Sequence, residues 1–208
     1  PPLLSRTILG TALGAIAVVG SAANANWLVP WTDHAAEQRA RETNPDEPPK
    51  KPDERAKSLT QITRSGGAMF GSLLGGIVAS ALGRRLSYFL MSLGAFAASS
   101  YIFSQLDPLH PQFHLFAFAL GFIGIMFFGW LPLFLPELFP TRVRSTGAGI
   151  SFNSGRVVAA AVVLSGGFLL ERFSGDYSAV GFWSGTVYAL GMLVIWFVPR
   201  RVAGRLED

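Results

Sequence analysis

The sequence predicts an all-α integral membrane protein with six transmembrane helices. Half of the 208 residues are hydrophobic and only 14% are charged, whereas soluble proteins carry roughly 25% charged residues. Thirteen of the 30 charged residues lie between positions 33 and 57, which leaves 17 charges in the other 183 residues. That density is too low to cover a water-soluble globule. The rest of the chain divides into six charge-poor stretches of 19 to 29 residues, and about 20 apolar residues make one membrane-spanning helix.

The first helix is predicted at residues 7–29. Asn24 and Asn26 are two residues apart and therefore point in different directions, so that one can line a cavity while the other hydrogen-bonds a neighbouring helix. Trp27 and Trp31 fit the aromatic belt of a membrane interface.

A polar loop is predicted at residues 32–58. Between positions 33 and 57 it holds four prolines, seven acidic and six basic residues. Such a segment cannot bury apolar surface, so we expect a mobile, solvated spacer. The alternative is a folded recognition element.

The second helix is predicted at residues 59–82, with Arg64 near one end, where a long side chain can snorkel to the headgroups. A small residue recurs at every fourth position, and such a stripe lets another helix backbone approach closely. The stripe serves either static packing or a smooth surface over which helices slide. It consists of Gly67, Gly71, Gly75, Ala79 and Gly83.

The third and fourth helices are predicted at 86–103 and 113–135. In the fourth, Trp130 either lines a cavity or packs in the core. Pro132, Pro136 and Pro140 recur every four residues, and each removes a backbone donor and bends the end of the helix.

A charged junction follows the fourth helix at the membrane boundary. Glu137 precedes Arg142 and Arg144 by five and seven residues, which predicts a charge-paired turn. The alternative is a plain solvated turn, because charges at the interface cost little.

The fifth helix is predicted at 145–170 and contains the best candidate for a substrate contact. Arg156 lies eleven residues after Ser145, about 16 Å deep at 1.5 Å per residue. A charge near mid-bilayer costs at least about 2.5 kcal/mol, so Arg156 should face a watery cavity or a partner, and Asn153 shares its side of the helix. The alternative is structural pairing with an acid or with helix carbonyls, although no Asp or Glu lies centrally in any span.

The sixth helix is predicted at 180–198, and the basic residues then set the orientation. Eight arginines fall at one side of the membrane, opposite Arg172 and the long loop, and the positive-inside rule places both chain ends in the cytoplasm. The eight are Arg6, Arg84, Arg85, Arg142, Arg144, Arg200, Arg201 and Arg205.

Several classes of function are disfavoured by composition. The chain has no cysteine, which excludes disulfides and thiolate chemistry. Its basic residues are scattered, which argues against nucleic acid as a partner. No phosphate loop, zinc helix or nucleophile elbow occurs, and His34, His110 and His114 are too dispersed for a metal site. We therefore expect neither an enzyme nor a cofactor. The chain begins Pro1-Pro2 without Met, so we expect a fragment.

Two motifs resemble the major facilitator superfamily. Between the second and third helices, Gly76 to Arg85 resembles its loop motif glycine-x-x-x-acid-x-x-glycine-basic-basic, with Ser80 in the acidic place. After the fourth helix, the Pro136-Glu137 and Pro140-Thr141 pairs, followed by arginines and glycine, resemble the junction of helices ten and eleven in its organic-ion and sugar transporters.

The resemblance covers essentially the whole chain, as helices seven to twelve of a twelve-helix facilitator. It implies a six-helix half that pairs with a missing amino-terminal half, binds substrate between the halves and alternates access by rocking. It further implies a proton gradient as energy source, and a cytoplasmic gate. The gate would comprise Gly76, Gly83, Arg84, Arg85, Glu137, Arg142 and Arg144; the family's latch role for the acid is not carried over to Ser80.

We therefore expect secondary active transport of a small polar or anionic organic solute, in a bacterial inner membrane and with a coupling proton. The expected substrate-binding residues are Arg156, Asn153, Asn24, Asn26 and Trp130. The alternative from another class is a six-span sensor or assembly protein that uses the long loop and transports nothing.

Overall fold

The computed structural model describes residues 2–43 and 54–199, and all regular structure within them is helical. The α-helices are α1 (Pro2–Val19), α2 (Leu28–Thr43), α3 (Glu54–Leu82), α4 (Arg84–Gln105), α5 (Pro111–Glu137), α6 (Arg144–Leu164), α7 (Gly166–Arg172) and α8 (Tyr177–Val194). Six helical stretches are long and apolar enough to cross a membrane, and the chain is an integral membrane protein. Helices α4 and α5 each extend two residues beyond both predicted limits.

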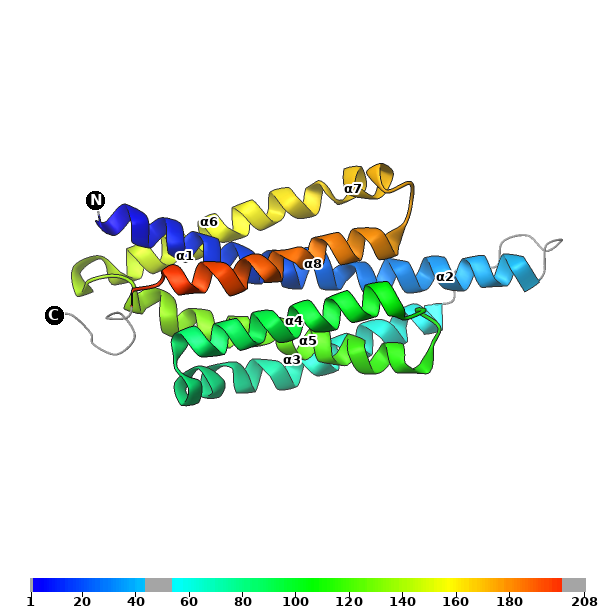
Figure 1. Ribbon diagram of the computed structural model, residues 1–208, viewed down its shortest axis with the longest axis horizontal. Helices are drawn as coiled ribbons and strands as arrows, with labels where there is room; N and C mark the ends of the chain where they lie inside the picture. Colours follow the sequence, from blue (N-terminus) through cyan, green and yellow to red (C-terminus); the bar gives the residue numbers. More distant parts are fainter. Residues whose placement is uncertain (1, 44–53, 200–208) are drawn as a thin grey trace.

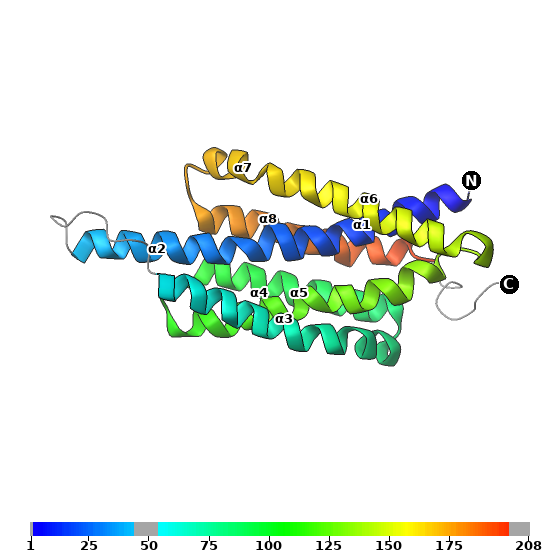
Figure 2. The same cartoon turned by 180° about the vertical axis from the view of Figure 1, so that it is seen from behind.

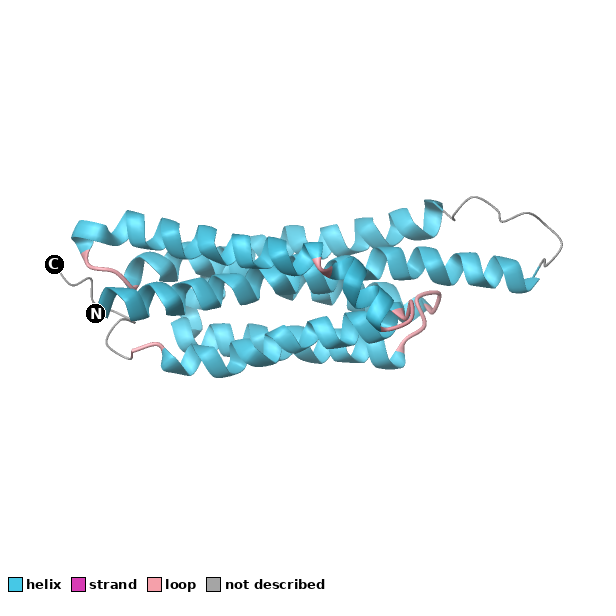
Figure 3. Ribbon diagram, turned by 90° about the horizontal axis from the view of Figure 1, so that it is seen from above, coloured by secondary structure: helices cyan, strands magenta, loops and turns pink. Residues whose placement is uncertain are grey.

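The spans form one bundle of roughly parallel and antiparallel rods with their loops gathered at the two ends (Figures 1 and 3). Helix α1 begins at the same end at which α8 finishes, on the left of Figure 1. Helix α3 packs on α5, α4 packs on α5 and α8, and α1 lies between α8 and α6. Seen from behind, the same order holds, with α3 and α6 at opposite edges (Figure 2).

The core is aromatic and lies where α4, α5 and α8 meet. The Trp130 ring stacks on Phe134 with centroids 4.4 Å apart and lies 4.7 Å from Tyr88. Phe127 joins Tyr88 to Tyr188, at 5.0 and 6.2 Å. All five side chains are fully buried, so these rings hold the three helices in one register.

The stripe of small residues on α3 packs against α5. A Cβ added at Gly67 or Gly71 would run into the backbone of Phe118 or Phe122, so only glycine permits this separation. Because the pairs advance together along both helices, α3 and α5 run in the same direction. The geometry fits the static-packing interpretation. Gly83 is not part of the packed stripe, since its φ of 80° forms the turn into α4.

The predicted loop at 32–58 is wrong for its first part. Residues 33–43 continue α2, and α3 begins at Glu54 rather than at residue 59. Ala, Glu, Gln and Arg favour helix even where no apolar face is buried, and Glu37 pairs with Arg41 one turn later at 2.6 Å. The four prolines fall in 44–53, outside the described residues.

Two predicted spans are interrupted helices rather than single ones. The first runs through a π-helical turn, Gly20–Asn24, and a 3-10 turn, Ala25–Trp27, between α1 and α2. The fifth breaks at Ser165, where the Gly166-Gly167 pair weakens helix propensity. The two breaks lie side by side, because the Trp27 ring is 3.1 Å from where a Cβ of Gly166 would stand.

Candidate functional site

An ion pair joins the two motifs at the end of the bundle where α3 passes into α4. Arg84 Nη2 lies 2.8 Å from Glu137 Oε1, and Arg84 Nε lies 3.2 Å from both carboxylate oxygens. Arg84 Nη1 also donates to the Ala79 carbonyl at 3.1 Å. The two side chains are only 20% and 21% exposed, so this forked pair is shielded from water and connects the end of α5 to the start of α4.

The expected pairing of Glu137 with Arg142 and Arg144 is wrong in this structure. Among the described residues, Glu137 forms its ion pair with Arg84 alone. Arg144 instead donates to the Thr141 hydroxyl at 3.2 Å. Arg142 lies in a 3-10 turn, Thr141–Val143, and is exposed. Sequence spacing suggested the nearest arginines, whereas the fold brings in one 53 positions away.

Trp130 packs in the core beside this ion pair and does not line a cavity. Its indole N–H donates to the Arg84 carbonyl at 2.9 Å and to the Ser87 hydroxyl at 3.0 Å. The side chain is fully buried. Of the two roles predicted for Trp130, packing in the core is the one that the structure shows, and the prediction that it contacts substrate is corrected. Sequence reasoning missed Ser87, which has no motif of its own.

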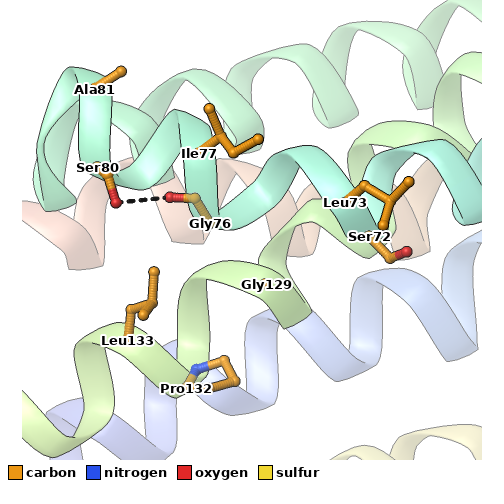
Figure 4. Close-up of a pocket in the computed structure, with 9 residues that line it drawn as sticks. All are labelled: Ser72, Leu73, Gly76, Ile77, Ser80, Ala81, Gly129, Pro132 and Leu133. Atoms are coloured by element: carbon orange, nitrogen blue, oxygen red, sulfur yellow. Dashed lines mark hydrogen bonds between the residues drawn. The ribbon is translucent and has the colours of Figure 1, made fainter.

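Beside the ion pair, an open groove of about 800 Å³ runs between α3 and α5 (Figure 4). Its lining residues are Ser72, Leu73, Gly76, Ile77, Ser80 and Ala81 of α3 and Gly129, Pro132 and Leu133 of α5. The Ser80 hydroxyl donates to the Gly76 carbonyl at 3.0 Å, so it is satisfied within its own helix. Arg85 is partly buried, and its Nε has no partner in the described part of the chain.

Arg156 lies on the surface of α6 with Asn153. Gly155 faces α1, where an added Cβ would stand 2.7 Å from the Ala15 nitrogen, and this contact turns Arg156 outward. Its guanidinium lies 5.9 Å from the centre of the Phe152 ring. Within residues 2–43 and 54–199, no acidic side chain pairs with it. Asn153 Nδ2 donates to the Gly149 carbonyl at 2.9 Å, which leaves its amide oxygen available.

The two asparagines of the first span lie in different surroundings, as their spacing predicts. Asn24 is fully buried and donates to the Gly181 carbonyl at 2.7 Å and to Ser184 Oγ at 3.1 Å. Asn26 is exposed and lines a pocket of about 250 Å³ between the two helix breaks. Most of this pocket is formed by apolar residues of the two turns and the start of α2 on one side, and of α6 and α7 on the other. The Gly166-Gly167 pair was the sequence signal that could have located it.

Comparison with known proteins points to membrane transport. The family model described as Sugar (and other) transporter matches residues 109–208. The chain is 32% identical over 144 residues to a Cupriavidus pinatubonensis protein named "Probable 4-methylmuconolactone transporter", which is 67% of this chain and 33% of that protein. It is 32% identical over 114 residues to the cis,cis-muconate transport protein of Acinetobacter baylyi, covering 55% and 26%.

A third relative is the inner membrane metabolite transport protein YhjE of Escherichia coli, 36% identical over 89 residues, or 42% of this chain and 20% of that protein. The chain therefore spans about a third or less of the length of the curated relatives it matches. These relatives are named as transporters and not as enzymes.

Proposed function

We propose that this chain, which belongs to the major facilitator superfamily of membrane transporters, is the carboxyl-terminal six-helix half of a secondary transporter for small organic anions. The missing amino-terminal half would pack against the open face that carries the α3–α5 groove and the Arg156 side of α6. Substrate would bind between the halves and reach each side of the membrane in turn.

One observation carries the proposal of an anionic substrate. Arg156 lies twelve residues after the start of α6, about 18 Å along the helix, and no acidic residue among those described pairs with it. An unpaired guanidinium at that depth costs at least about 2.5 kcal/mol. A carboxylate that binds there offsets this cost, with the Asn153 amide as a second contact.

The names of the relatives support this substrate class. One is named for cis,cis-muconate, which is by its name the anion of an organic acid. Another is named for 4-methylmuconolactone. Asn26 and its pocket of about 250 Å³ would form the wall along which the organic part of the solute passes.

We place the Arg84–Glu137 end of the bundle in the cytoplasm of a bacterial inner membrane. Arg6 lies near the start of α1, Arg84 and Arg85 begin α4, and Arg142 and Arg144 lie where α5 passes into α6. These helix ends lie at one end of the bundle (Figure 1), and the positive-inside rule assigns such an end to the cytoplasm. Three further arginines of the expected cytoplasmic set, Arg200, Arg201 and Arg205, lie outside the described residues. The Arg84–Glu137 pair and its neighbours Gly76 and Gly83 would form the cytoplasmic gate.

The proposed coupling ion is the proton. Asp and Glu residues of the described chain lie at or beyond the ends of the spans. The carboxylate that carries the proton would therefore belong to the amino-terminal half.

The test is uptake by the whole protein in liposomes. Labelled cis,cis-muconate and a panel of mono- and dicarboxylates are offered with an acidic exterior, with and without a protonophore. We expect saturable accumulation of at least one organic anion, abolished by the protonophore. Correctly inserted protein that takes up none of them contradicts the proposal, and uptake that only equilibrates contradicts the coupling to protons.

A further inference from the structure

We propose that Arg64, Gln61 and Ser65 form a second anion site, which captures carboxylates at the end of the bundle opposite the Arg84–Glu137 pair. This inference rests on the proposed transport of organic anions and adds the residues at which the solute enters. Arg64 holds the charge, Ser65 supplies a hydroxyl donor and Gln61 is a positioning residue.

Helix α5 holds the stem of Arg64 in place. An added Cβ at Gly121 would run into the Arg64 carbonyl and would stand 3.1 Å from Arg64 Cγ. Arg64 Nε is shielded from solvent and has no hydrogen-bond partner, while Nη2 donates to Gln61 Oε1 at 3.2 Å. The side chain is therefore partly buried against α5 and tethered to its own helix, and it does not snorkel freely.

Arg64 lacks a counter-charge. Among the described residues, Glu37, Asp33 and Glu137 pair with Arg41, Lys57 and Arg84, and no acidic side chain pairs with Arg64. A partly desolvated guanidinium without an acid attracts an anion from outside the chain. Arg84 in the same bundle differs from Arg64 in this respect, because its guanidinium already binds the carboxylate of Glu137.

The exposed surface of α3 has an apolar side and a side with small or polar residues. Arg64 lies next to the second side, along which water and a polar solute can pass. On one side Ile62 and Phe70 are 68% and 51% exposed, as expected of a lipid-facing surface. The other side carries small or polar residues at helical spacing. These are Gln61, Ser65, Ser72 and Gly76, and the last two line the groove of Figure 4 together with Leu73 and Ile77.

The donors available here match a carboxylate. Gln61 uses its oxygen for Arg64 and donates from Nε2 to Ser65 Oγ at 3.3 Å. The Ser65 proton therefore remains free to donate, beside the planar fork of the guanidinium. A fork and a hydroxyl on one helical turn bind the two oxygens of a carboxylate better than a neutral solute.

The depth of the site indicates its place in the transport path. Arg64 precedes Leu82, the last residue of α3, by 18 residues, or about 27 Å, whereas Arg156 lies about 18 Å from the same end of the bundle. An anion that enters from the opposite end therefore meets Arg64 before it reaches Arg156.

The test uses the absence of cysteine from these 208 residues. In the whole protein, with any cysteines elsewhere replaced, Ser65→Cys is labelled by anionic sulfonatoethyl and by cationic trimethylammonioethyl methanethiosulfonate. Relative to a free thiol, we expect the anionic reagent to be favoured over the cationic one about sevenfold, as Coulomb's law gives for unit charges about 7 Å apart in water. Arg64→Gln should abolish this preference, and cis,cis-muconate should slow the anionic reaction.

Two controls separate this site from general effects. Arg172→Gln removes the same charge from the same end of the bundle and should leave the preference intact. Ile62→Cys faces the lipid and should react with neither reagent. A Ser65→Cys that does not react, or a preference that Arg64→Gln leaves unchanged, overturns the proposal. In the uptake assay Arg64→Gln should raise KM about tenfold with kcat little changed. Failure of all uptake refutes the transport function, while the labelling still reports on the site.

Discussion

At the residue scale, the organising feature is the ion pair between Arg84 and Glu137. Three arginine–carboxylate distances of 2.8–3.2 Å and an indole donor on the Arg84 carbonyl fix its geometry. Because both side chains are mostly shielded, removing one partner leaves a charge without compensation. The pair therefore ties α3, α4 and α5 together at one point.

This arrangement predicts strong coupling in a double-mutant cycle. Arg84→Ala and Glu137→Ala should each destabilise the protein, and the double variant should cost less than their sum, with a coupling energy of about 1–3 kcal/mol. Unfolding in detergent measures the four proteins. Effects that add within about 0.5 kcal/mol would show that the pair contributes nothing specific.

At the element scale, the contact of α3 with α5 depends on glycines rather than on large side chains. Gly71 has no room for a Cβ because the Phe122 backbone occupies the place, whereas Gly66 on the same helix meets only Phe118 Cε2 at 3.9 Å. The same substitution at these two positions therefore separates packing from helix propensity.

We expect Gly71→Ala to lower the free energy of unfolding by about 1–3 kcal/mol, because the two helices must move apart. Gly66→Ala should be neutral or stabilising by up to about 1 kcal/mol, because alanine favours helix. Thermal unfolding of both variants in the same detergent measures the difference. Equal stability of the two would contradict the close approach of α3 and α5.

The start of α8 offers a pH-dependent element outside the spans. Burial alone would raise the pKa of Asp176, but hydrogen bonds from the Ala179 N–H and from the Ser178 hydroxyl and N–H outweigh it, and the pKa is lowered. A lowered folded-state pKa means that the charged cap stabilises fully above the unfolded pKa of about 3.9 and is lost as the pH falls through the folded value.

Asp176→Ala should therefore cost about 1 kcal/mol at pH 7, the usual value of an N-cap. The difference in free energy of unfolding between this variant and the wild type should become smaller as the pH falls from about 5 to 3. Asp176→Asn keeps a capping oxygen and serves as the control. Unfolding curves over this pH range measure all three, and a gap that widens in acid would contradict the assignment.

Helices were predictable from sequence where hydrophobicity alone determines their limits. Helices α4 and α5 begin and end close to the places where charged residues return in the sequence. Residues 33–43 are helical although they have few apolar side chains, because Ala, Glu and Arg have high helix propensity. The break at Ser165 depends on how Trp27 packs beside Gly166, which no local pattern reveals.

The candidate site was predictable only in part for the same reason. Asn24 and Asn26 separate as their spacing requires, and Arg156 stands out because charges are rare in spans. The partner of Glu137 and the burial of Trp130 depend on contacts between helices distant in sequence. The proposed role of Arg64 depends on its packing against Gly121 of α5, which no local pattern reveals.

At the scale of the whole molecule, the bundle has an unfinished surface. Arg156 is exposed and the groove of about 800 Å³ is open, while Arg64 is partly buried, and arginine side chains are not expected on a lipid-facing surface. On the proposed function, this chain supplies only part of the contacts to the substrate. We therefore expect residues 1–208 alone, inserted in liposomes, to give no uptake above that of empty liposomes, and robust uptake by this chain would refute the half-transporter account.

The central claim is that Arg156 recognises the carboxylate of the solute. The most direct measurement compares initial uptake of the accepted organic anion by the whole protein, by Arg156→Gln, by Arg156→Lys and by Arg172→Gln, at matched levels of inserted protein. The account predicts a loss of at least tenfold in kcat/KM for Arg156→Gln, partial recovery for Arg156→Lys because the charge remains, and no loss for Arg172→Gln. Uptake by Arg156→Gln that equals the wild type would contradict it.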